Sequence, residues 1–438
     1  MTETSMTRAC MMNAGMTKAR RMTVVAALLL GVALNASATI SAHAQYTDGV
    51  IKIGVLTDLS GLYADLAGPG SITAAKLAVA DFNAASKGMK VEIVSGDHQN
   101  KPDIAANLAN AWFDVDKVDV IVELVNSGVA LAVSEVARVK NKAALVSGAA
   151  SSDLTGSKCN ANTVHWAYDT WALANGTGKA MVKAGGGSWF FLTADYAFGY
   201  ALERDTAAVV EANGGKVLGR VRAPLNTNDF SSFLLQAQAS RAKVIGLANA
   251  GGDTINSIKQ AAEFGIVKGG QSLAGLLLFA SDIAALGLPT AQGLVLTETW
   301  YWDMTDANRA WTKRWQAARP GKFPTMNHAG VYSAVIHYLK TVEALKTDGD
   351  GKTVVAKMKD MPTDDPLFGK GVIRVDGRKI HDAYLFEVKK PAESKYPGDF
   401  YKTRATIPAA EAFRPLKDDG CPLVQGRPSF SSPVFGGG

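Results

Sequence analysis

Short apolar runs alternate along the chain with longer segments in which apolar residues recur every three or four positions. The run Ile51–Leu59 precedes a helix-like segment at 74–85, and Val91–Asp97 and Val118–Leu124 are each followed by another. Short apolar runs are typical of buried strands, and the three-to-four spacing is typical of amphipathic helices. The alternation predicts an α/β lobe, with a parallel sheet covered by helices on both faces.

A second series of the same kind runs from Ser188 to Ile266. One stretch from each series, VDVIVELVNSGVALAVSEVAR and AKVIGLANAGGDTINSIKQAAE, places Asn-small-Gly between a strand-like and a helix-like run. We interpret the two series as lobes of related architecture, with chance similarity between strand–helix units as the alternative. A chain of 438 residues also exceeds the size at which one hydrophobic core keeps growing.

The remainder of the chain predicts two further helices, a hairpin and a tail. Helix-like segments lie at 307–318 and 328–345, and the segment Val372–Val388 is expected to turn at Asp376 and Gly377. Beyond Lys390 the chain is rich in Pro and Gly, and we expect this tail to wrap the surface.

The first 44 residues have the pattern of a signal peptide. Basic residues precede the apolar run Val24–Leu34, and Ala42-His43-Ala44 is the small-x-small pattern that signal peptidase accepts. The run is too short for a membrane-spanning helix. We therefore expect export with cleavage near Ala44, and Cys10 precedes the apolar core, so no lipid anchor is expected.

Removing that segment changes what charge and cysteine content indicate. It carries four basic residues and one acidic residue, so the net charge falls from +6 to +3. No basic run typical of nucleic-acid binding is present. Cys159 and Cys421 remain, and an even count in an oxidising compartment predicts a disulfide between them, with two unpaired thiols as the alternative.

The sequence offers no catalytic pattern. It has no GxSxG elbow, no GxGxxG after its first strand, and no pair of His at the i, i+4 spacing of helical zinc ligands. We therefore expect neither an enzyme nor a cofactor. What remains is a set of strand ends rich in small, hydroxyl and amide residues, at the edge where open parallel sheets bind ligands.

The stretch VSGAASSDLTG, residues 146–156, is the most distinctive of these strand ends. Its exposed backbone N–H groups and hydroxyls could hold a carboxylate through Ala149, Ala150, Ser151 and Ser152. The alternative is that Ser151, Ser152 and Asp153 cap the next helical turn.

Taken in order, IKIGVLTDLSGLYADLAGPG, VSGAASSDLTG, LTADYAFG and LANAGGDT closely resemble periplasmic solute-binding proteins of the branched-chain amino acid ABC transporter family. The resemblance implies two Rossmann-like lobes joined by a three-strand hinge, the type I periplasmic binding protein fold. The implied division is a signal peptide at 1–44, a first lobe at 45–165 with a return at 300–348, a second lobe at 166–299 with a return at 349–390, and a tail at 391–438.

The resemblance also implies where the ligand binds. In the first lobe the implied ligand-binding residues are Tyr63, Asn126, Ser127, Ala149, Ala150, Ser151 and Ser152; in the second they are Tyr196, Phe198, Asn249, Gly251 and Asp282. Asp282 stands near where amino-acid binders place a carboxylate for the ligand ammonium, and a solvated helix cap is its alternative role.

The implied function is capture of a small carboxylate-bearing solute and its delivery to permease subunits in the inner membrane, by a monomer. If Asp282 faces the cleft, a branched-chain or other amino acid is favoured, because both charges then find partners. If it faces solvent, the aromatic walls favour an aromatic or other apolar carboxylate. A sensory ligand-binding module is the remaining alternative.

Overall fold

The computed structural model describes residues 46–418 and 420–425. The predicted signal peptide, with Cys10, lies outside these residues. Within them, no helix is both long enough and apolar enough to span a membrane.

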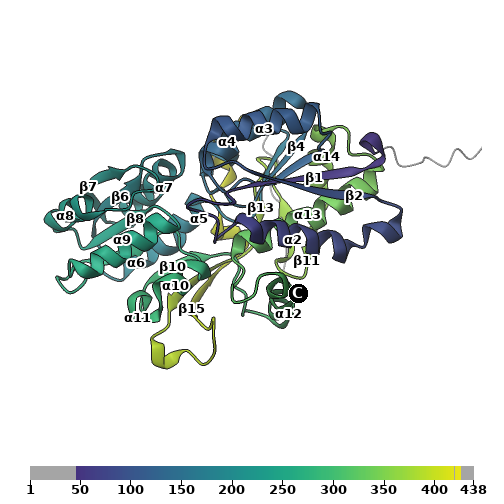
Figure 1. Cartoon of the computed structure of the whole chain (residues 1–438). Coiled ribbons are helices and arrows are strands. Elements are labelled where there is room, and N and C mark those ends of the chain that lie inside the picture. The colour runs from purple at the N-terminus through teal and green to yellow at the C-terminus, as the bar shows by residue number, and fades with distance from the viewer. Residues whose placement is uncertain (1–45, 419, 426–438) are drawn as a thin grey trace, which may run out of the picture. The chain divides into compact units, whose positions relative to one another are not determined.

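The first lobe is built on a parallel five-stranded sheet in the order β2-β1-β3-β4-β5. Its strands are β1 (Ile51–Thr57), β2 (Val91–Asp97), β3 (Val120–Glu123), β4 (Ala143–Val146) and β5 (Thr163–His165). Figure 1 shows α3 (Pro102–Asp114) and α4 (Ser127–Lys140) on one face of this sheet, and α2 (Gly68–Phe82) and α13 (Met326–Leu345) on the other.

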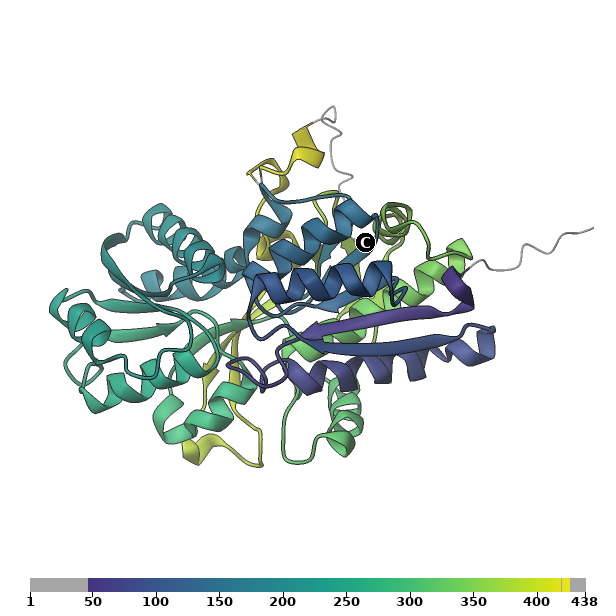
Figure 2. The ribbon, with the colours of Figure 1, turned by 45° about the horizontal axis from the view of Figure 1, so that its top comes forward.

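The second lobe repeats this plan. Its parallel sheet has the order β7-β6-β8-β9, formed by β6 (Ser188–Ala194), β7 (Lys216–Ala223), β8 (Val244–Ala248) and β9 (Ser272–Gly275). Its helices are α6 (Lys179–Lys183), α7 (Ala197–Ala212), α8 (Ser231–Ala239) and α9 (Gly252–Glu263). Strand for strand the order matches β2-β1-β3-β4, so the predicted relationship between the two lobes is confirmed. Figure 2 shows both sheets and their helices from a second direction.

Two small antiparallel sheets complete the fold. One has the order β10-β14-β15, from Val295–Glu298, Ala383–Val388 and Tyr401–Ile407, and the other has the order β11-β12-β13, from Thr363–Asp365, Gly369–Ile373 and Lys379–Ile380. The predicted hairpin turn at Asp376 and Gly377 is present, with Gly377 in a left-handed conformation (φ 89°). Strand β15 lies in the predicted surface tail and was missed.

The remaining elements are short connections, apart from two helices of the returning chain. The two are α12 (Asp306–Ala318) and α14 (Gly351–Asp360). The short ones are α5 (Thr170–Leu173), α10 (Ala280–Leu286), α11 (Leu288–Ala291), α15 (Ala409–Ala412), α16 (Pro422–Gln425), the 3-10 turns η1 (Thr47–Gly49), η2 (Ala84–Lys87), η3 (Ser152–Thr155), η5 (Pro391–Glu393) and η6 (Leu416–Asp418), and the π-helical turn η4 (Ala174–Gly178).

Arg378 fixes the segment that crosses from the first lobe to the second. Its guanidinium is fully buried and donates to the backbone carbonyls of Trp166, Tyr168 (2.9 Å) and Lys379 (3.0 Å). Its counter-charge is Asp169, at 3.6 Å. A buried guanidinium is tolerated only when its donors are used, and here backbone carbonyls use them.

The implied division has the chain return from the second lobe to the first at residues 299 and 300. This segment is held to the first crossing segment, because the Thr299 hydroxyl donates to the carbonyl of Ala167 at 3.0 Å. In the segment 349–390, predicted to return to the second lobe, helix α14 begins beside the first lobe, with Gly351 N–H donating to Asn141 at 2.8 Å. The division of the chain into lobe segments stays a prediction.

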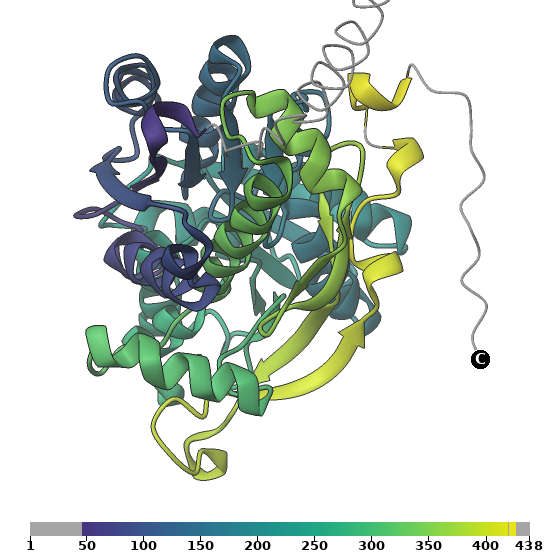
Figure 3. The same cartoon turned by 90° about the vertical axis from the view of Figure 1, so that its right-hand side faces the viewer.

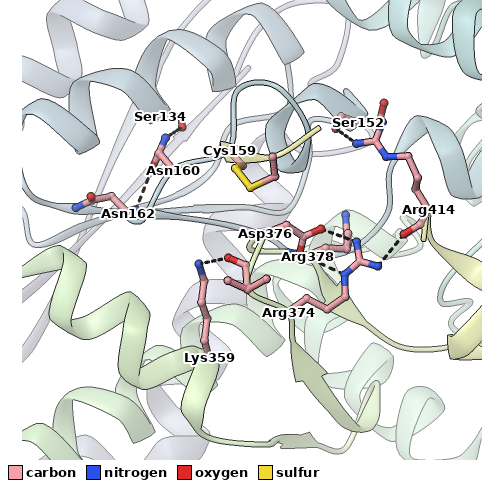
Figure 4. Close-up of a disulfide and its surroundings, with 12 residues drawn as sticks. Ser134, Ser152, Cys159, Asn160, Asn162, Lys359, Arg374, Asp376, Arg378 and Arg414 are labelled. Carbon is pink, nitrogen blue, oxygen red and sulfur yellow. Dashed lines mark hydrogen bonds and ion pairs between the residues drawn. A yellow bond between two sulfur atoms is a disulfide. The ribbon is translucent and has the colours of Figure 1, made fainter. Parts of the chain in front are cut away.

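The predicted disulfide between Cys159 and Cys421 is confirmed, with a Cα–Cα distance of 5.6 Å (Figure 4). It ties the loop after η3 to the C-terminal segment, which Figure 3 shows in yellow beyond β15. The same segment is held by Arg414, which donates to the carbonyl of Ser152 (3.1 Å) and accepts from Arg374 at its own carbonyl (2.7 Å).

Removing this disulfide is expected to destabilise the protein without changing its fold. The bridge joins residues 262 positions apart, and cross-links that close long loops typically contribute about 2 to 4 kcal/mol. We expect Cys159→Ser with Cys421→Ser to lower the melting temperature. A reducing agent should lower the melting temperature of the native chain in the same way and leave the double variant unchanged. Identical melting of the native and double-variant proteins would contradict this assignment.

Candidate functional site

A small cavity lies where the loops of the two lobes meet. Its lining is almost wholly apolar and aromatic: Tyr63, Leu66, Val125, Gly148 and Ala150 come from the first lobe, Tyr196, Phe198, Ala250, Leu277 and Phe279 from the second, and Tyr168 from the crossing segment. Most of these residues follow the carboxyl ends of parallel strands, where open sheets bind ligands. The free space is about 10 Å³, enough for no more than one water molecule.

Two tyrosines connect the lobes across this cavity. The hydroxyls of Tyr63 and Tyr196 share a hydrogen bond of 2.7 Å. Tyr63 is positioned by the turn before it, in which the Asp58 carboxylate accepts from the N–H groups of Gly61 and Tyr63, both at 2.8 Å. Burial raises the pKa of both hydroxyls above the usual value, so each remains a neutral donor and acceptor.

Aromatic rings fill the rest of the cavity wall. Tyr168 meets Phe279 edge to face, with ring centroids 5.9 Å apart, and Tyr196 packs on Phe198 at the same centroid distance. Tyr168 and Phe279 were not among the residues predicted from sequence. Tyr168 is held by a hydrogen bond from its hydroxyl to the carbonyl of Gly148, at 2.5 Å. The wall can therefore contact a flat or branched apolar group on several sides.

Only part of the predicted carboxylate loop, residues 149–152, lies at the cavity. Ala150 lines the cavity. Ala149 lies behind it, with its carbonyl accepting from the His165 ring at 2.7 Å. The N–H groups of Ser151 and Ser152 donate to the hydroxyls of Ser127 and Thr170, both at 3.1 Å.

The hydroxyls of the two serines have structural partners. Ser151 caps the turn η3 by accepting from Asp153 N–H, at 3.3 Å. Ser152 donates to the buried carboxylate of Asp205 on α7 at 2.6 Å, and Thr170 donates to the same oxygen, also at 2.6 Å. The Ser152 hydroxyl thus connects the first lobe to the second through the carboxylate of Asp205.

Three other predicted residues act locally in the structure. Asn126 caps α4 by accepting from Val129 N–H at 3.1 Å. Asn249 accepts from Thr254 and donates to Ser257 within its own lobe. Asp282 is buried and caps α10 by accepting from Phe279 N–H at 3.0 Å, while burial raises its pKa to about 7.

Gly251 packs against the first lobe. It has a left-handed φ of 56°, and a β-carbon there would lie 2.9 Å from the carbonyl of Leu62 and 3.0 Å from the ring of Tyr63. Glycine alone therefore allows this close approach.

Asp253 is a candidate that sequence reasoning missed. It lies in the first turn of α9, is 2 % exposed, and accepts from Asn226 N–H through one oxygen at 3.1 Å. Its other oxygen has no hydrogen-bond partner among the residues that the structure describes. Burial raises its pKa to about 7, and its charge adds to the rise in the pKa of Tyr63 and Tyr196. The GGDT motif, residues 251–254, is the sequence feature from which Asp253 could have been identified.

No cluster of three or more His, Cys, Asp or Glu suited to a metal ion occurs in residues 46–418 and 420–425. The cavity is enclosed by strand-end loops of both lobes. The family model for periplasmic binding proteins matches residues 50–395. The chain belongs to that family.

Solved structures agree with this assignment. A periplasmic binding protein from Burkholderia mallei is 54 % identical, with a TM-score of 0.84 over 86 % of this chain and all of that one. A branched-chain amino acid ABC transporter periplasmic ligand-binding protein from Burkholderia xenovorans LB400 is 38 % identical, with a TM-score of 0.75 over 85 % of this chain and all of that one. The resemblance to branched-chain solute-binding proteins and the two-lobed type I fold are thereby confirmed.

A more distant relative was solved with a ligand. The solute-binding protein of an ABC transporter from Rhodopseudomonas palustris HaA2, in complex with p-hydroxybenzoic acid, is 25 % identical, with a TM-score of 0.75 over 82 % of this chain and 97 % of that one. All three relatives are named as binding proteins. None of these names describes an enzyme.

In this periplasmic binding protein, Ser152→Ala is expected to reduce stability. The substitution removes the bond to the buried Asp205 carboxylate and a bond accepted from the half-exposed Arg204. The first, a bond to a buried charged group, contributes about 1.5 to 3 kcal/mol. We expect the free energy of unfolding in urea to fall by about that amount, with Ser232→Ala, at an exposed position on α8, as the neutral control. Unchanged stability together with weaker ligand binding would instead make Ser152 a ligand contact.

Proposed function

We propose that this protein is the substrate-binding component of an ABC transporter and that its solute is a small apolar amino acid. The protein would capture the solute between its lobes, as a monomer in the periplasm, and deliver it to permease subunits in the inner membrane. The signal peptide would be cleaved near Ala44. The observation that supports this most is an apolar cavity enclosed by strand-end loops of both lobes.

The lining favours an apolar body in the solute. Its side chains include five aromatic rings with Leu66, Val125 and Leu277, and no charged side chain lines it among the described residues. Burying a branched or aromatic side chain in such surroundings contributes about 1.5 to 3 kcal/mol. A sugar or a polyol would leave its hydroxyl groups without partners there.

The two charged ends of an amino acid have candidate partners on opposite lobes. The loop at Gly148, Ala149 and Ala150 is our candidate for the carboxylate, since it follows a parallel strand and reaches the cavity. Asp253 is our candidate for the ammonium, because one of its oxygens is buried and unpaired near Tyr63 and Tyr196. This places the ammonium at Asp253 and not at Asp282, whose carboxylate already caps a helix.

Binding would require the lobes, or the rings between them, to move. The present free space of about 10 Å³ holds no amino acid. The hydrogen bond between Tyr63 and Tyr196 connects the lobes where we place the solute. We infer that a solute shifts the population between open and closed forms by replacing contacts such as this one.

An aromatic or other apolar carboxylate without an ammonium is the second candidate. The aromatic lining and the relative in complex with p-hydroxybenzoic acid favour it. The two candidates differ in whether Asp253 contributes to binding.

Matched pairs of solutes separate the two candidates. L-Leucine differs from 4-methylpentanoate, and L-phenylalanine from 3-phenylpropanoate, by the ammonium group alone. We expect an amino acid to raise the melting temperature of the native protein and its deaminated partner to bind about ten- to a hundredfold more weakly, as expected for one lost charge-assisted bond. Asp253→Asn should remove this difference, as measured by calorimetric titration.

The control is Asp103→Asn, which removes an exposed carboxylate from the first turn of another helix, α3. It should leave both affinities unchanged. Equal binding of both members of a pair, unaffected by Asp253→Asn, would favour the carboxylate without ammonium. A panel of amino acids and aromatic acids that produces no shift at all would contradict both candidates.

A further inference from the structure

Unpaired polar atoms gather on the first-lobe side of the cavity. Longer contacts with the hydroxyls of Thr57 and Tyr168 act as weak hydrogen bonds to Glu123 and Asn327, but Glu123 Oε1, Ser147 Oγ and both amide atoms of Asn327 have no hydrogen bond of normal length within residues 46–418 and 420–425. All three side chains are fully buried. They come from the end of β3, the loop after β4 and the first turn of α13. Buried polar atoms are nearly always paired, so a group of unpaired ones beside a cavity needs an explanation.

Gly148 is the residue that brings Glu123 close to the cavity. A β-carbon on Gly148 would lie 2.3 Å from Glu123 Oε1 and 2.7 Å from the α-carbon of Val125. Gly148 itself lines the cavity. The carboxyl group of Glu123 therefore lies directly behind the backbone of Gly148, which lines the cavity.

The backbone holds Glu123 in an uncommon conformation. Glu123 and Leu124 have left-handed φ angles of 87° and 62°, which residues other than glycine seldom adopt and which cluster at functional sites. The Glu123 carbonyl accepts from the N–H groups of Ser147 (3.0 Å) and Gly148 (3.1 Å). Its Oε2 accepts from Val125 N–H at 3.0 Å. These bonds leave Oε1 fixed against Gly148.

The charges around Glu123 favour its neutral form. Burial raises its pKa to about 8, the Thr57 hydroxyl and Val125 N–H oppose the rise, and Asp58 adds to it. Asp58 is the charged group facing it from the loop after β1. In the crossing segment, Glu123 faces Tyr168. Burial raises the pKa of Tyr168 well above the usual value, and Glu123 adds to this rise. The β4 loop and α13 present the uncharged Ser147 and Asn327.

We propose that Glu123 is a specificity-determining residue of the proposed solute site, positioned behind Gly148 and acting through Tyr168 and the Gly148 loop. Carrying its proton, it leaves the wall beside the solute carboxylate uncharged. This inference rests on the proposed function, because it assumes that an anion binds at Gly148 and Ala150. An ionised Glu123 would place a second negative charge beside that anion, with little water between them to screen it.

Binding and protonation of Glu123 are then linked. A bound carboxylate favours the neutral acid, so the complex takes up a proton when the pH is above the pKa of free Glu123. Below about pH 7 affinity should not depend on this group. Above pH 8 the affinity of the native protein should fall by up to about tenfold per pH unit, which is the limit for one linked proton. Asp253, with a pKa of about 7, titrates below this window.

The first test needs no solute. Glu123→Gln keeps the acceptor for Val125 N–H and removes the titrating group. Other buried acids, such as Asp253, Asp282 and Glu298, also have raised pKa values, so the measurement is the infrared difference spectrum between native protein and Glu123→Gln. At pH 7 it should contain the C=O band of one buried carboxylic acid, which disappears with a midpoint near pH 8. The difference spectrum between native protein and Glu135→Gln, an exposed position on α4, should lack this band. Absence of the band from the Glu123→Gln difference spectrum at pH 7 would overturn the inference, whatever solutes bind.

The second test uses 3-phenylpropanoate and L-phenylalanine as probes, in calorimetric titrations from pH 6.5 to 9.5 in buffers of different ionisation enthalpy. For 3-phenylpropanoate we expect proton uptake and a falling affinity above pH 8 in the native protein, and neither in Glu123→Gln. For both probes the affinity of Glu123→Gln at pH 7 should stay within about threefold of native. The 3-phenylpropanoate arm removes any contribution from a solute ammonium.

The outcomes separate the two proposals. Binding of a probe with the same pH profile in native protein and Glu123→Gln would overturn the inference and leave the proposed function standing. Loss of binding in Glu123→Gln at pH 7 would also overturn it, since an uncharged donor should suffice. Failure of every probe and panel member to bind the native protein would contradict the proposed function, and the linkage would fall with it.

Discussion

The arrangement of the cavity depends on one buried cation in the crossing segment. Arg378 donates to the carbonyls of Trp166 and Tyr168 and faces Asp169, so it fixes the chain as it leaves the first sheet. Tyr168 then lies with its hydroxyl on Gly148, and Thr170 is placed where its hydroxyl meets Asp205 of the second lobe. A guanidinium buried this completely must have its donors satisfied, and backbone carbonyls satisfy them whatever side chains surround them. The position of the loop at Gly148 and Ala150 is thus set from behind by the crossing segment.

The need to give every buried polar group a partner also explains why the cavity is so apolar. Strand-end loops are rich in hydroxyl and amide side chains, but most of these side chains are used to hold the loops and lobes in place. Ser152 binds Asp205, Ser127 accepts from Ser151, and Asn126 caps a helix. Each such bond satisfies a buried polar group that would otherwise destabilise the fold. The aromatic rings are left facing the cavity, where shape and burial can select a solute.

Much of the fold could be predicted from the sequence, because each parallel strand is a short apolar run and each helix keeps its spacing. The internal match between the stretches at Asn126 and Asn249 did correspond to equivalent strands, β3 and β8. Strand β15 could not be predicted in the same way, because it lies in a segment rich in Pro and Gly and pairs with β14 only through the tertiary fold.

At the cavity, Tyr63, Ala150, Tyr196 and Phe198 come together as expected. Tyr168 and Phe279 were not predicted, because the sequence around an aromatic residue in an apolar run does not show whether its ring lines a cavity or lies in the core. The partners of Ser152 and Asp282 depend on contacts that no local pattern contains.

Each lobe has an acid with an unpaired oxygen close in sequence to a residue that lines the cavity: Glu123 at the end of β3, near Val125, and Asp253 in the first turn of α9 after β8, near Ala250. Because β3 and β8 hold the same place in their sheets, the two lobes bring one acid each to equivalent edges. A buried carboxyl without a partner is costly, and it is costlier when ionised. The two differ in how readily they ionise, since burial raises the pKa of Asp253 to about 7 and that of Glu123 to about 8. The acid of lower pKa is the one that a nearby ammonium can ionise at least cost, and the acid of higher pKa can stay neutral beside a carboxylate. A solute with one positive and one negative end would therefore match the charge states of both acids in one orientation, with its ammonium toward the second lobe and its carboxylate toward the first.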